Sequence, residues 1–287
     1  MHNPSFRIDQ PRNRTTSVVF ASPHSGRDYG LEFLRRTMLD ELGIRSSEDA
    51  FVDRLFDTAP DYGAPLIACH APRAYVDLNR ASDELDPAVI RGLRVQRHNP
   101  RVSSGLGVIP RVVAGGRAIY RGKLDREEAQ QRLDRIWHPY HENLQRLLDE
   151  SRATFGQAIL VDCHSMPHEA VRTAPGRADK RPQVVLGDRF GAACGSGIME
   201  RIEGAFTAVG LRVARNAPFA GAFITQHYGR PSIGQHAIQV EIDRSLYMDE
   251  TRIRPSRHFP GFRDVLRGVI EDIAEIGRAE ALPVAAE

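Results

Sequence analysis

The sequence contains two stretches that decide the fold: VVFASPHSG at residues 18–26 and ILVDCHS at residues 159–165. Both begin with a short, unbroken apolar run, which is typical of a strand buried on both faces of a sheet. Both runs lead to a histidine, His24 in the first stretch and His164 in the second. In open α/β sheets the ligand crevice lies beyond the carboxyl ends of such strands, so we expect both imidazoles to reach that crevice.

These two histidines predict a metal site. A catalytic zinc site takes three protein ligands and keeps one position open, and two imidazoles from separate strands would supply two of the three. Histidine and carboxylate ligands suit zinc, although iron, cobalt or manganese could occupy such a site. The alternative is that His24 and His164 are hydrogen-bonded polar residues at strand ends.

The third ligand is predicted to be acidic. Asp49 lies in the first turn of a helix expected over residues 46–59, from which it could reach a metal over a strand end. An acidic residue in a first helical turn is also favoured by the helix dipole alone, which is the competing explanation. Glu48 is the alternative ligand, and Asp53, one turn later, could orient the ligands.

The alternation of apolar patterns predicts an α/β fold: a single domain with a mixed, mainly parallel sheet flanked by helices. Strands are expected at 17–22, 65–69, 73–78, 157–162, 183–187, 211–215, 222–226 and 236–242. Helices are expected at 46–59, with Ser46 or Ser47 as the cap, and at 124–150, 192–208 and 262–277. Loops are expected at 83–123 and, over the site, at 166–182.

The composition describes a chain that can bury a sizeable core. Its 287 residues are 41% hydrophobic and 26% charged, which fits one large domain or at most two. No repeat or linker marks an internal boundary, so we expect a polar N-terminal arm over 1–15 and a catalytic domain over 16–280. The formal charge of +2 comes from 39 basic and 37 acidic residues, so net charge does not indicate a nucleic-acid binder.

The cysteines and the N-terminal sequence are used to predict the cellular compartment of the protein. The three cysteines are an odd number without a C-x-x-C motif, which argues against a disulfide framework and fits a reducing cytosol. The N-terminus has no apolar signal segment, and no stretch approaches about 18 consecutive apolar residues. We therefore expect a soluble, cytoplasmic protein with neither a nucleic-acid nor a membrane partner.

Glu241 lies in the middle of the strand expected at 236–242, where a period of two places it on one face with Gln239 and Asp243. A carboxylate in mid-strand lies on a solvated face or in a site, because an unpaired buried charge is expensive. An ordinary half-exposed antiparallel strand explains it equally well. As a functional group, Glu241 would be the general base for the attacking water and then the general acid for the leaving nitrogen.

Two further polar residues, Asn79 and Arg80, follow the strand expected at 73–78. They fall where this strand would open into the crevice, and a guanidinium there suits bidentate capture of a substrate carboxylate. Arginine and asparagine are also ordinary surface residues. On the residues alone, this signal is weak.

The segment 216–231 mixes turn formers with His227, Tyr228 and Arg230. It could supply an oxyanion stabiliser or a second carboxylate clamp, and it could equally be a rigid loop whose aromatic residues pack on the sheet.

Two common kinds of site are excluded because their sequence motifs are missing. The glycines at 115–116 do not form a nucleotide-binding loop between a strand and a helix, and no G-x-S-x-G nucleophile elbow occurs.

Taken together, these stretches resemble the N-formylglutamate amidohydrolases, a family similar in fold to the zinc carboxypeptidases and to the succinylglutamate desuccinylase and aspartoacylase group. The matching stretches are residues 22–26, 48–56, 73–80, 162–166, 186–191, 221–231 and 239–242. They run in family order over most of the chain, and their combination is specific although no single stretch is.

The resemblance implies a phosphorylase/hydrolase-like α/β fold with one zinc ion per chain. It implies that His24, Asp49 and His164 bind this ion. The chain departs from the carboxypeptidase pattern, in which a His-x-x-Glu motif supplies two ligands, because residues 25–27 after the first histidine contain no glutamate. The acidic ligand must therefore come from elsewhere in the chain.

The resemblance also assigns roles to three other positions. Glu241 resembles the catalytic glutamate at a strand end of the carboxypeptidases. Asn79 and Arg80 resemble the Asn-Arg pair with which those enzymes hold a terminal carboxylate. Arg73 or Arg230 would then supply a second cationic contact for a substrate with two carboxylates.

The reaction implied by the resemblance is hydrolysis of an N-acyl amino acid, expected to be N-formyl-L-glutamate plus water giving formate and L-glutamate, a step of histidine degradation. The partner is thus expected to be an acidic small molecule. The nearest alternative is the same chemistry on another acyl group or a small peptide. An alternative of a different class is a non-catalytic module that binds acidic metabolites through its arginines. Nothing in the sequence indicates an oligomeric state.

Overall fold

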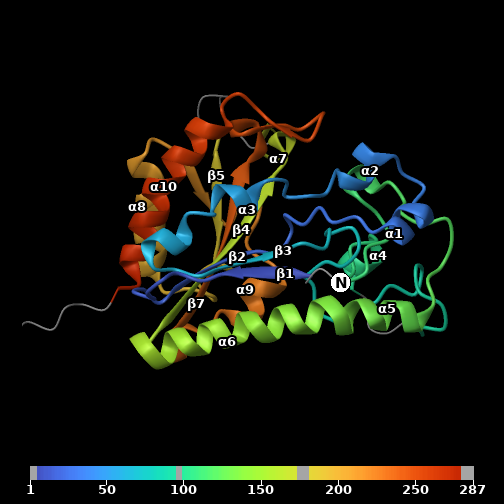
Figure 1. The fold of residues 1–287 in the computed structure, drawn as a ribbon, viewed down its shortest axis with the longest axis horizontal. Helices are drawn as coiled ribbons and strands as arrows, with labels where there is room; N and C mark the ends of the chain where they lie inside the picture. The colour runs from blue at the N-terminus through green and yellow to red at the C-terminus, as the bar shows by residue number, and fades with distance from the viewer. Residues whose placement is uncertain (1–4, 95–98, 173–180, 279–287) are drawn as a thin grey trace, which may run out of the picture.

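The computed structural model describes residues 5–94, 99–172 and 181–278, and Figure 1 shows their arrangement. The strands of the main sheet are β1 (Phe6–Asp9), β2 (Val18–Ser22), β3 (Leu66–Cys69), β4 (Ala158–Met166), β5 (Val184–Gly187), β6 (Val213–Arg215) and β7 (Gln235–Asp243). They form one seven-stranded sheet in the order β1-β3-β2-β4-β7-β5-β6.

The centre of this sheet is parallel. Strands β3, β2, β4 and β7 run in one direction, whereas β1 is antiparallel to β3 and β5 is antiparallel to β7. Strand β6 runs parallel to β5 at the far edge. A separate two-stranded ribbon consists of β8 (Met248–Asp249) and β9 (Arg254–Pro255). The predicted α/β fold with a mixed, mainly parallel sheet is confirmed.

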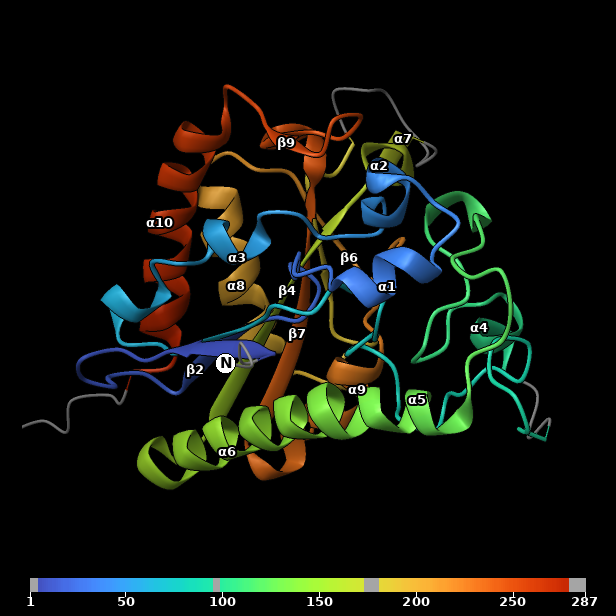
Figure 2. The ribbon, with the colours of Figure 1, turned by 45° about the vertical axis from the view of Figure 1, so that its right-hand side comes forward.

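Helices cover both faces of the sheet, as Figures 1 and 2 show. They are α1 (Leu31–Arg36), α2 (Glu41–Arg45), α3 (Val52–Leu55), α4 (Pro100–Ser103), α5 (Arg126–Arg132), α6 (His138–Phe155), α7 (His168–Arg172), α8 (Ser196–Ala208), α9 (Phe223–Tyr228) and α10 (Phe259–Ile276). Short 3-10 turns lie at Ala59–Tyr62, Ala114–Gly116, Pro231–Ile233 and Arg244–Leu246. The core on one face contains residues of α3, α8 and α10, and the core on the other contains residues of α5, α6 and α9.

The apolar runs of the central strands are buried on both faces. In β2, Val18 and Phe20 belong to the core layer with α10, whereas Val19 and Ala21 belong to the layer with α6. Every residue of β2 and of β4 is buried. A strand between two helical layers needs apolar side chains on both faces, which explains the unbroken pattern in the sequence.

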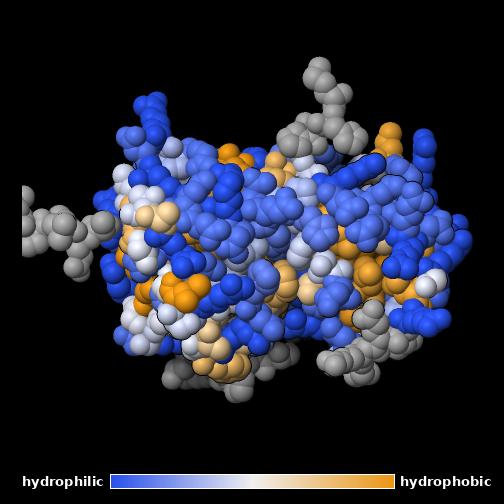
Figure 3. All heavy atoms as spheres, turned by 90° about the horizontal axis from the view of Figure 1, so that it is seen from below, coloured by the Kyte–Doolittle hydropathy of each residue, from blue (hydrophilic) through white to orange (hydrophobic). Residues whose placement is uncertain are grey.

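The helix expected at 124–150 is present as α5 and α6, joined by a π-helical turn at Leu133–Trp137. It ends at Gly156, whose φ of 75° belongs to the left-handed region. Its apolar stripe, which includes Leu144 and Leu147, faces the sheet. Figure 3, seen from below, shows that the surface on this side is mostly hydrophilic, with apolar residues in separate patches.

Two expected strands are wrong. Residues 73–78 form turns, because the amides of Tyr75 and Val76 both donate to the carbonyl of Pro72. The buried residues of this stretch, such as Val76 and Leu78, belong to a loop packed on the core, without a neighbouring strand. Residues 222–226 belong largely to helix α9, in which Ile224 and Tyr228 are buried at the four-residue spacing of a helical face.

The helix expected over 46–59 is also wrong in its extent. Ser46 is the C-cap of α2, and α3 begins only at Val52, after Phe51 adopts a left-handed φ of 67°. Asp49 therefore lies in the connection between two short helices. Its backbone amide donates to the carbonyl of His24 at 3.0 Å, which ties this connection to the end of β2.

The N-terminal segment expected to be an arm contributes the edge strand β1, which pairs with β3. Strand β4 is longer than expected and continues to Met166, so His164 lies inside the strand and not after it. The domain end expected at 280 and part of the loop expected at 166–182 lie outside the described residues. Within the described ranges, no helix has the length and apolar character needed to cross a membrane.

The turn after β2 makes a testable prediction about stability. We expect Gly26→Ala to lower the free energy of unfolding by about 1–3 kcal/mol, because a Cβ at this buried position would lie 2.0 Å from the carbonyl oxygen of Ala71. Gly30→Ala is the matched control, since a Cβ there meets no atom within 4 Å. Urea unfolding measures both variants, and equal stabilities would contradict the packing of the Gly26 turn against Ala71.

Candidate metal centre and active site

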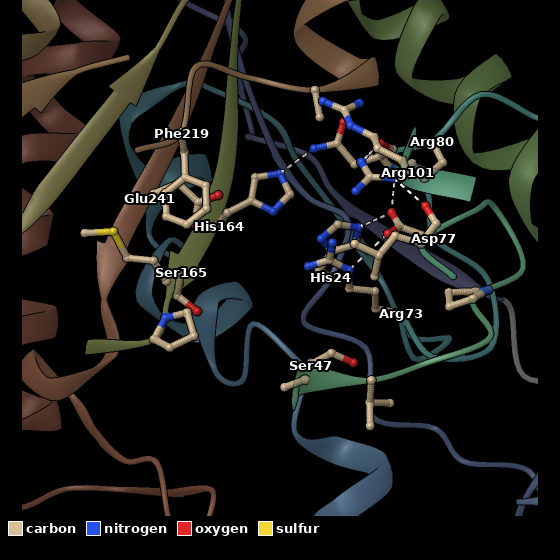
Figure 4. A pocket seen from close by; sticks show the side chains of 18 of the residues that line it. His24, Ser47, Arg73, Asp77, Arg80, Arg101, His164, Ser165, Phe219 and Glu241 are labelled. Atoms are coloured by element: carbon tan, nitrogen blue, oxygen red, sulfur yellow. Dashed lines mark hydrogen bonds and ion pairs between the residues drawn. The ribbon is translucent and has the colours of Figure 1, made fainter. Parts of the chain in front are cut away.

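A cavity of about 690 Å³ opens at the carboxyl ends of the central parallel strands. His24 follows β2, His164 lies near the end of β4, and Glu241 lies near the end of β7, and all three line this cavity. Figure 4 shows their side chains around the cavity, with several arginines on its far side. The crevice predicted from the two apolar runs is therefore present.

His24, Asp49 and His164 form a buried group that could hold a metal ion. One side-chain atom of each lies within 4.8 Å of the other two. Asp49 Oδ2 lies 2.9 Å from Nδ1 of His164 and 3.4 Å from Nδ1 of His24. Nδ1 of His24 is buried and has no hydrogen-bond partner in the described part of the chain. This orphaned nitrogen, beside a carboxylate and a second imidazole, has the chemistry of a catalytic zinc donor set, so these residues fit a metal.

A second carboxylate lies behind each histidine. Nε2 of His24 lies 2.7 Å from Asp77 Oδ1, and Nε2 of His164 lies 2.9 Å from Asp162 Oδ2, although without the alignment of a hydrogen bond. Both carboxylates are buried. Metal-binding histidines usually place their second ring nitrogen against such a carboxylate, which orients the ring and favours an unprotonated nitrogen toward the metal.

The two oxygens of Asp49 have different partners. While Oδ2 faces the histidines, Oδ1 accepts hydrogen bonds from Arg244 Nη2 at 3.0 Å and from Ser165 Oγ at 3.4 Å. Burial alone would raise the pKa of the Asp49 carboxyl, but the contacts of its oxygens with His164 and His24 hold this pKa well below its usual range. Asp49 is therefore a carboxylate anion, the form that a metal ligand must have.

The choice between Asp49 and Glu48 is decided by the direction of each side chain. Glu48 is turned away from the histidines and accepts hydrogen bonds from Arg45 Nε at 3.0 Å and from the Tyr29 hydroxyl at 2.7 Å. The structure thus brings Asp49 to the histidines, and not Glu48.

The prediction that Asp53 orients the ligands is wrong. Its carboxylate forms ion pairs with Arg7 at 3.2 Å and with Arg27 at 3.1 Å. Because the expected continuous helix is interrupted at Phe51, Asp53 does not lie one helical turn from the ligand position. Asp77 and Asp162 contact the histidines instead.

Glu241 lies beside His164, because these two residues are register partners across the parallel pair β4 and β7. Its Oε1 accepts a hydrogen bond from Gln239 Nε2 at 2.8 Å. The half-exposed antiparallel strand considered as an alternative is excluded here, because β7 is a buried strand. Burial is the main cause that raises the pKa of Glu241 to about 7. Such a group can both take up and release a proton near neutral pH.

The expected carboxylate-binding residues line the same cavity but differ in their partners. Arg73 forms an ion pair with Asp77 at 3.0 Å. The side-chain oxygen of Asn79 accepts a hydrogen bond from the backbone amide of Ile224 at 2.8 Å, which ties the loop that contains Asn79 to helix α9. Arg80 donates only to carbonyl oxygens, those of Leu106 at 2.9 Å and Asn79 at 2.7 Å. Within the described residues, Arg80 has no carboxylate partner.

His227 and Arg230, predicted to bind substrate, line a neighbouring cavity of about 450 Å³ and not the one that the histidines line. The reason is helix α9, which replaces the expected strand. It exposes His227, whose ring stacks on Phe223 with centroids 5.0 Å apart. Tyr228 is buried, and its hydroxyl lies 2.9 Å from Nδ1 of His141, as in the rigid packing segment considered from the sequence.

Several residues of the site were not predicted from the sequence. Asp162 carries a recognisable signal, because it precedes His164 by two positions in a strand and so shares its face. Asp77 lies within the stretch that was singled out for Asn79 and Arg80. Arg101 and Arg244 carry no local signal, because their places in the cavity depend on contacts far along the chain.

Comparisons with known proteins identify the family and support the fold. A family model for N-formylglutamate amidohydrolases matches residues 16–248. An N-formylglutamate deformylase of Pseudomonas putida is 32% identical over 237 residues, which are 82% of either chain. Its counterpart from Pseudomonas aeruginosa is 31% identical over 268 residues, covering 90% of this chain and 91% of its own. The crystal structure of an N-formylglutamate amidohydrolase from Ralstonia eutropha JMP134 superposes with a TM-score of 0.88 at 31% identity, over 96% of this chain and 99% of that chain.

The histidine–aspartate group makes a prediction about metal binding. We expect Asp49→Asn to weaken zinc binding by more than the roughly 10–100-fold typical of changes outside the ligand shell, because it removes the only carboxylate that faces both described histidines. Glu48→Gln is the matched control and should bind zinc as the unchanged protein does. The measurement is the zinc content of each variant after loading and desalting. A loss of zinc in Glu48→Gln but not in Asp49→Asn would identify Glu48 as the ligand.

Proposed function

This chain belongs to the N-formylglutamate amidohydrolase family, and from that premise we propose that it hydrolyses N-formyl-L-glutamate to formate and L-glutamate with zinc as its cofactor. The family is one of hydrolases, so the chain is an enzyme and the non-catalytic binding module is set aside. The observation that carries the proposal is one cavity that His24, His164 and Glu241 line together, with Asp49 buried against both histidines.

The metal would be held by His24, Asp49 and His164. When bound, zinc supplies a Lewis acid that lowers the pKa of a water molecule and polarises the formyl carbonyl. Two imidazoles and one carboxylate favour zinc, and iron, cobalt or manganese are the other metals that such donors accept. Asp77 keeps the His24 ring oriented through its hydrogen bond, and the Asp162 carboxylate lies 2.9 Å from Nε2 of His164.

Glu241 would move the proton of the reaction. It takes a proton from the attacking water while the water oxygen bonds to the formyl carbon. It then delivers that proton to the amide nitrogen as the carbon–nitrogen bond breaks, so formate and the free amino group of glutamate leave. A carboxyl whose pKa burial raises to about 7 suits both steps at neutral pH.

Arg80 would hold a carboxylate of the substrate. Two carbonyl oxygens fix its guanidinium on the cavity wall, and no carboxylate of the described chain competes for it. An oriented guanidinium places the substrate with its amide toward the reacting groups, which lowers the entropic part of the barrier.

The cavity also supports a second candidate, the same hydrolysis with a longer acyl group. Its volume of about 690 Å³ lies well inside the range of about 300–1,000 Å³ that holds drug-sized ligands, so it has room beyond a formyl group. Comparing N-formyl-, N-acetyl- and N-succinyl-L-glutamate as substrates decides between the two candidates. The proposal expects the formyl compound to be hydrolysed with the highest kcat/KM.

Formate release from N-formyl-L-glutamate tests the proposed reaction and its metal together. We expect activity to disappear after chelation and to return when zinc is added back. The control is the same chelated protein given magnesium, which prefers oxygen ligands and should not restore the reaction. Undiminished formate release by protein shown to be free of metal would refute the zinc mechanism but not the substrate.

Replacing the proton-transfer group tests the role of Glu241. We expect Glu241→Gln to keep the zinc content of the unchanged protein and to reduce kcat by about 10²–10⁴-fold, because the amide cannot accept the proton. Glu203→Gln is a control, since Glu203 lies on α8 and pairs with Arg215 outside the cavity. Near-normal turnover of Glu241→Gln would remove Glu241 from the mechanism.

A further inference from the structure

Four arginines line the main cavity, and they fall into two kinds. Arg73 and Arg244 are neutralised by protein carboxylates, Asp77 and Asp49 respectively. Arg80 and Arg101 have no carboxylate within ion-pair distance anywhere in the described ranges. Figure 4 shows both of these arginines on the wall across the cavity from Glu241. Two guanidinium groups that form no ion pair with a described carboxylate, on one wall of a substrate cavity, indicate a ligand with two negative charges.

Arg80 occupies the deeper position. It is buried, and its Nε and Nη1 donate to carbonyl oxygens, which leaves Nη2 without a protein acceptor among the described residues. The carbonyl of Arg80 in turn accepts from the indole of Trp137 at 2.9 Å, so its backbone is held as well. Burial lowers the pKa of Arg80. The negative charges of Asp77 and Glu84 oppose this effect, whereas the positive charges of Arg73 and Arg101 act in the same direction as burial. An anion placed between Arg80 and Arg101 would relieve this repulsion.

Arg101 occupies the rim. It is the second residue of α4, and the Asn99 side chain caps this helix by accepting from the amide of Arg101 at 2.9 Å. Its backbone is therefore fixed, while its exposed side chain lines both the main cavity and the neighbouring one. An exposed guanidinium with a fixed base can meet a carboxylate that extends outward from a deeper site.

We propose that Arg101 binds the side-chain carboxylate of the substrate while Arg80 binds its α-carboxylate, which makes the enzyme selective for N-acyl derivatives of acidic amino acids. This inference rests on the proposed function. The α-carboxylate is attached to the carbon that carries the scissile nitrogen, so it must lie deep in the cavity. The side-chain carboxylate of glutamate lies two methylene groups farther out, and it reaches the rim.

Two other arginines were candidates for this second contact, and the structure gives each a different place. Arg73 already neutralises Asp77, so binding a substrate carboxylate would require it to leave a buried partner. Arg230 lines the neighbouring cavity and not the one with the histidines. Among the described residues, Arg101 is the arginine besides Arg80 that lines the main cavity without an ion-pair partner.

The test compares kcat/KM for N-formyl-L-glutamate and N-formyl-L-glutamine, measured by formate release. Glutamine has nearly the same shape but lacks the second charge. We expect Arg101→Gln to lower kcat/KM for the glutamate substrate about 10–100-fold, mainly through KM, and to leave the glutamine substrate nearly unchanged. Arg101→Lys should recover part of the preference for the glutamate substrate, because lysine restores the positive charge but not the planar guanidinium group that binds a carboxylate with two hydrogen bonds. Arg230→Gln is the matched control and should behave as the unchanged protein.

The result that overturns the inference is an equal loss for both substrates in Arg101→Gln, which would indicate a structural role, or no loss for either. A loss of the glutamate preference in Arg230→Gln instead would overturn it too. Binding of the product separates this inference from the proposed function. We expect calorimetry to find L-glutamate bound at least about tenfold more tightly than L-glutamine, and only with Arg101 intact.

The two kinds of failure are therefore distinguishable. If the unchanged protein releases no formate from either substrate but shows the Arg101-dependent preference for L-glutamate, the proposed reaction fails and the carboxylate site stands. If formate is released without any preference for glutamate over glutamine, the reaction stands and the role of Arg101 is refuted. If neither formate release nor the preference is found, both are refuted.

Discussion

The burial of the Asp49 carboxylate is the constraint on which the site depends. A carboxylate removed from water is costly unless its oxygens are paired. Here one oxygen faces the Nδ1 atoms of His24 and His164, and the other accepts from Arg244. These partners come from the end of β2, from β4 and from the turn after β7, so Asp49 is satisfied only when these parallel strands and their turns are correctly assembled. The same arrangement that satisfies the carboxylate creates the metal-type group.

Two carboxyl groups of this site have opposite properties, and their surroundings explain the difference. Asp49 is surrounded by donors and positive charge, which hold its pKa well below the usual range despite burial. Glu241 has Gln239 as its hydrogen-bond donor, and burial raises its pKa to about 7. A permanent anion suits a metal ligand, whereas a group that titrates near neutrality suits proton transfer. Hydrolysis by a metal-activated water requires one group of each kind.

Most of the fold could be predicted from the sequence, because the central strands and long helices carry strong periodic signals. The runs that end at His24 and His164 are apolar on both faces, and α10 has a continuous apolar stripe. The wrong predictions concern segments whose residues are buried although they form no regular strand or continuous helix. Burial alternates over residues 73–76 as it would in a strand, but residues 73–78 form a loop on the core. The helix expected around Asp49 is interrupted by the left-handed backbone of Phe51. A local pattern reports burial, and it does not report which backbone geometry produces that burial.

The sequence by itself determined the two histidines and the strand that carries Glu241, because each follows or lies in an apolar run that is readable locally. Arg80 was predicted from a strand at 73–78 that the structure replaces with turns. Only the tertiary structure decided that Asp49 and not Glu48 faces the histidines, and that Asp77 and Asp162 lie behind them. It also decided that Arg101 lies at the rim without an ion-pair partner among the described residues. The physical reason is separation along the chain. Asp49 meets Arg244 across 195 positions and His24 meets Asp77 across 53, and such pairings depend on the strand order of the sheet, which no local pattern records.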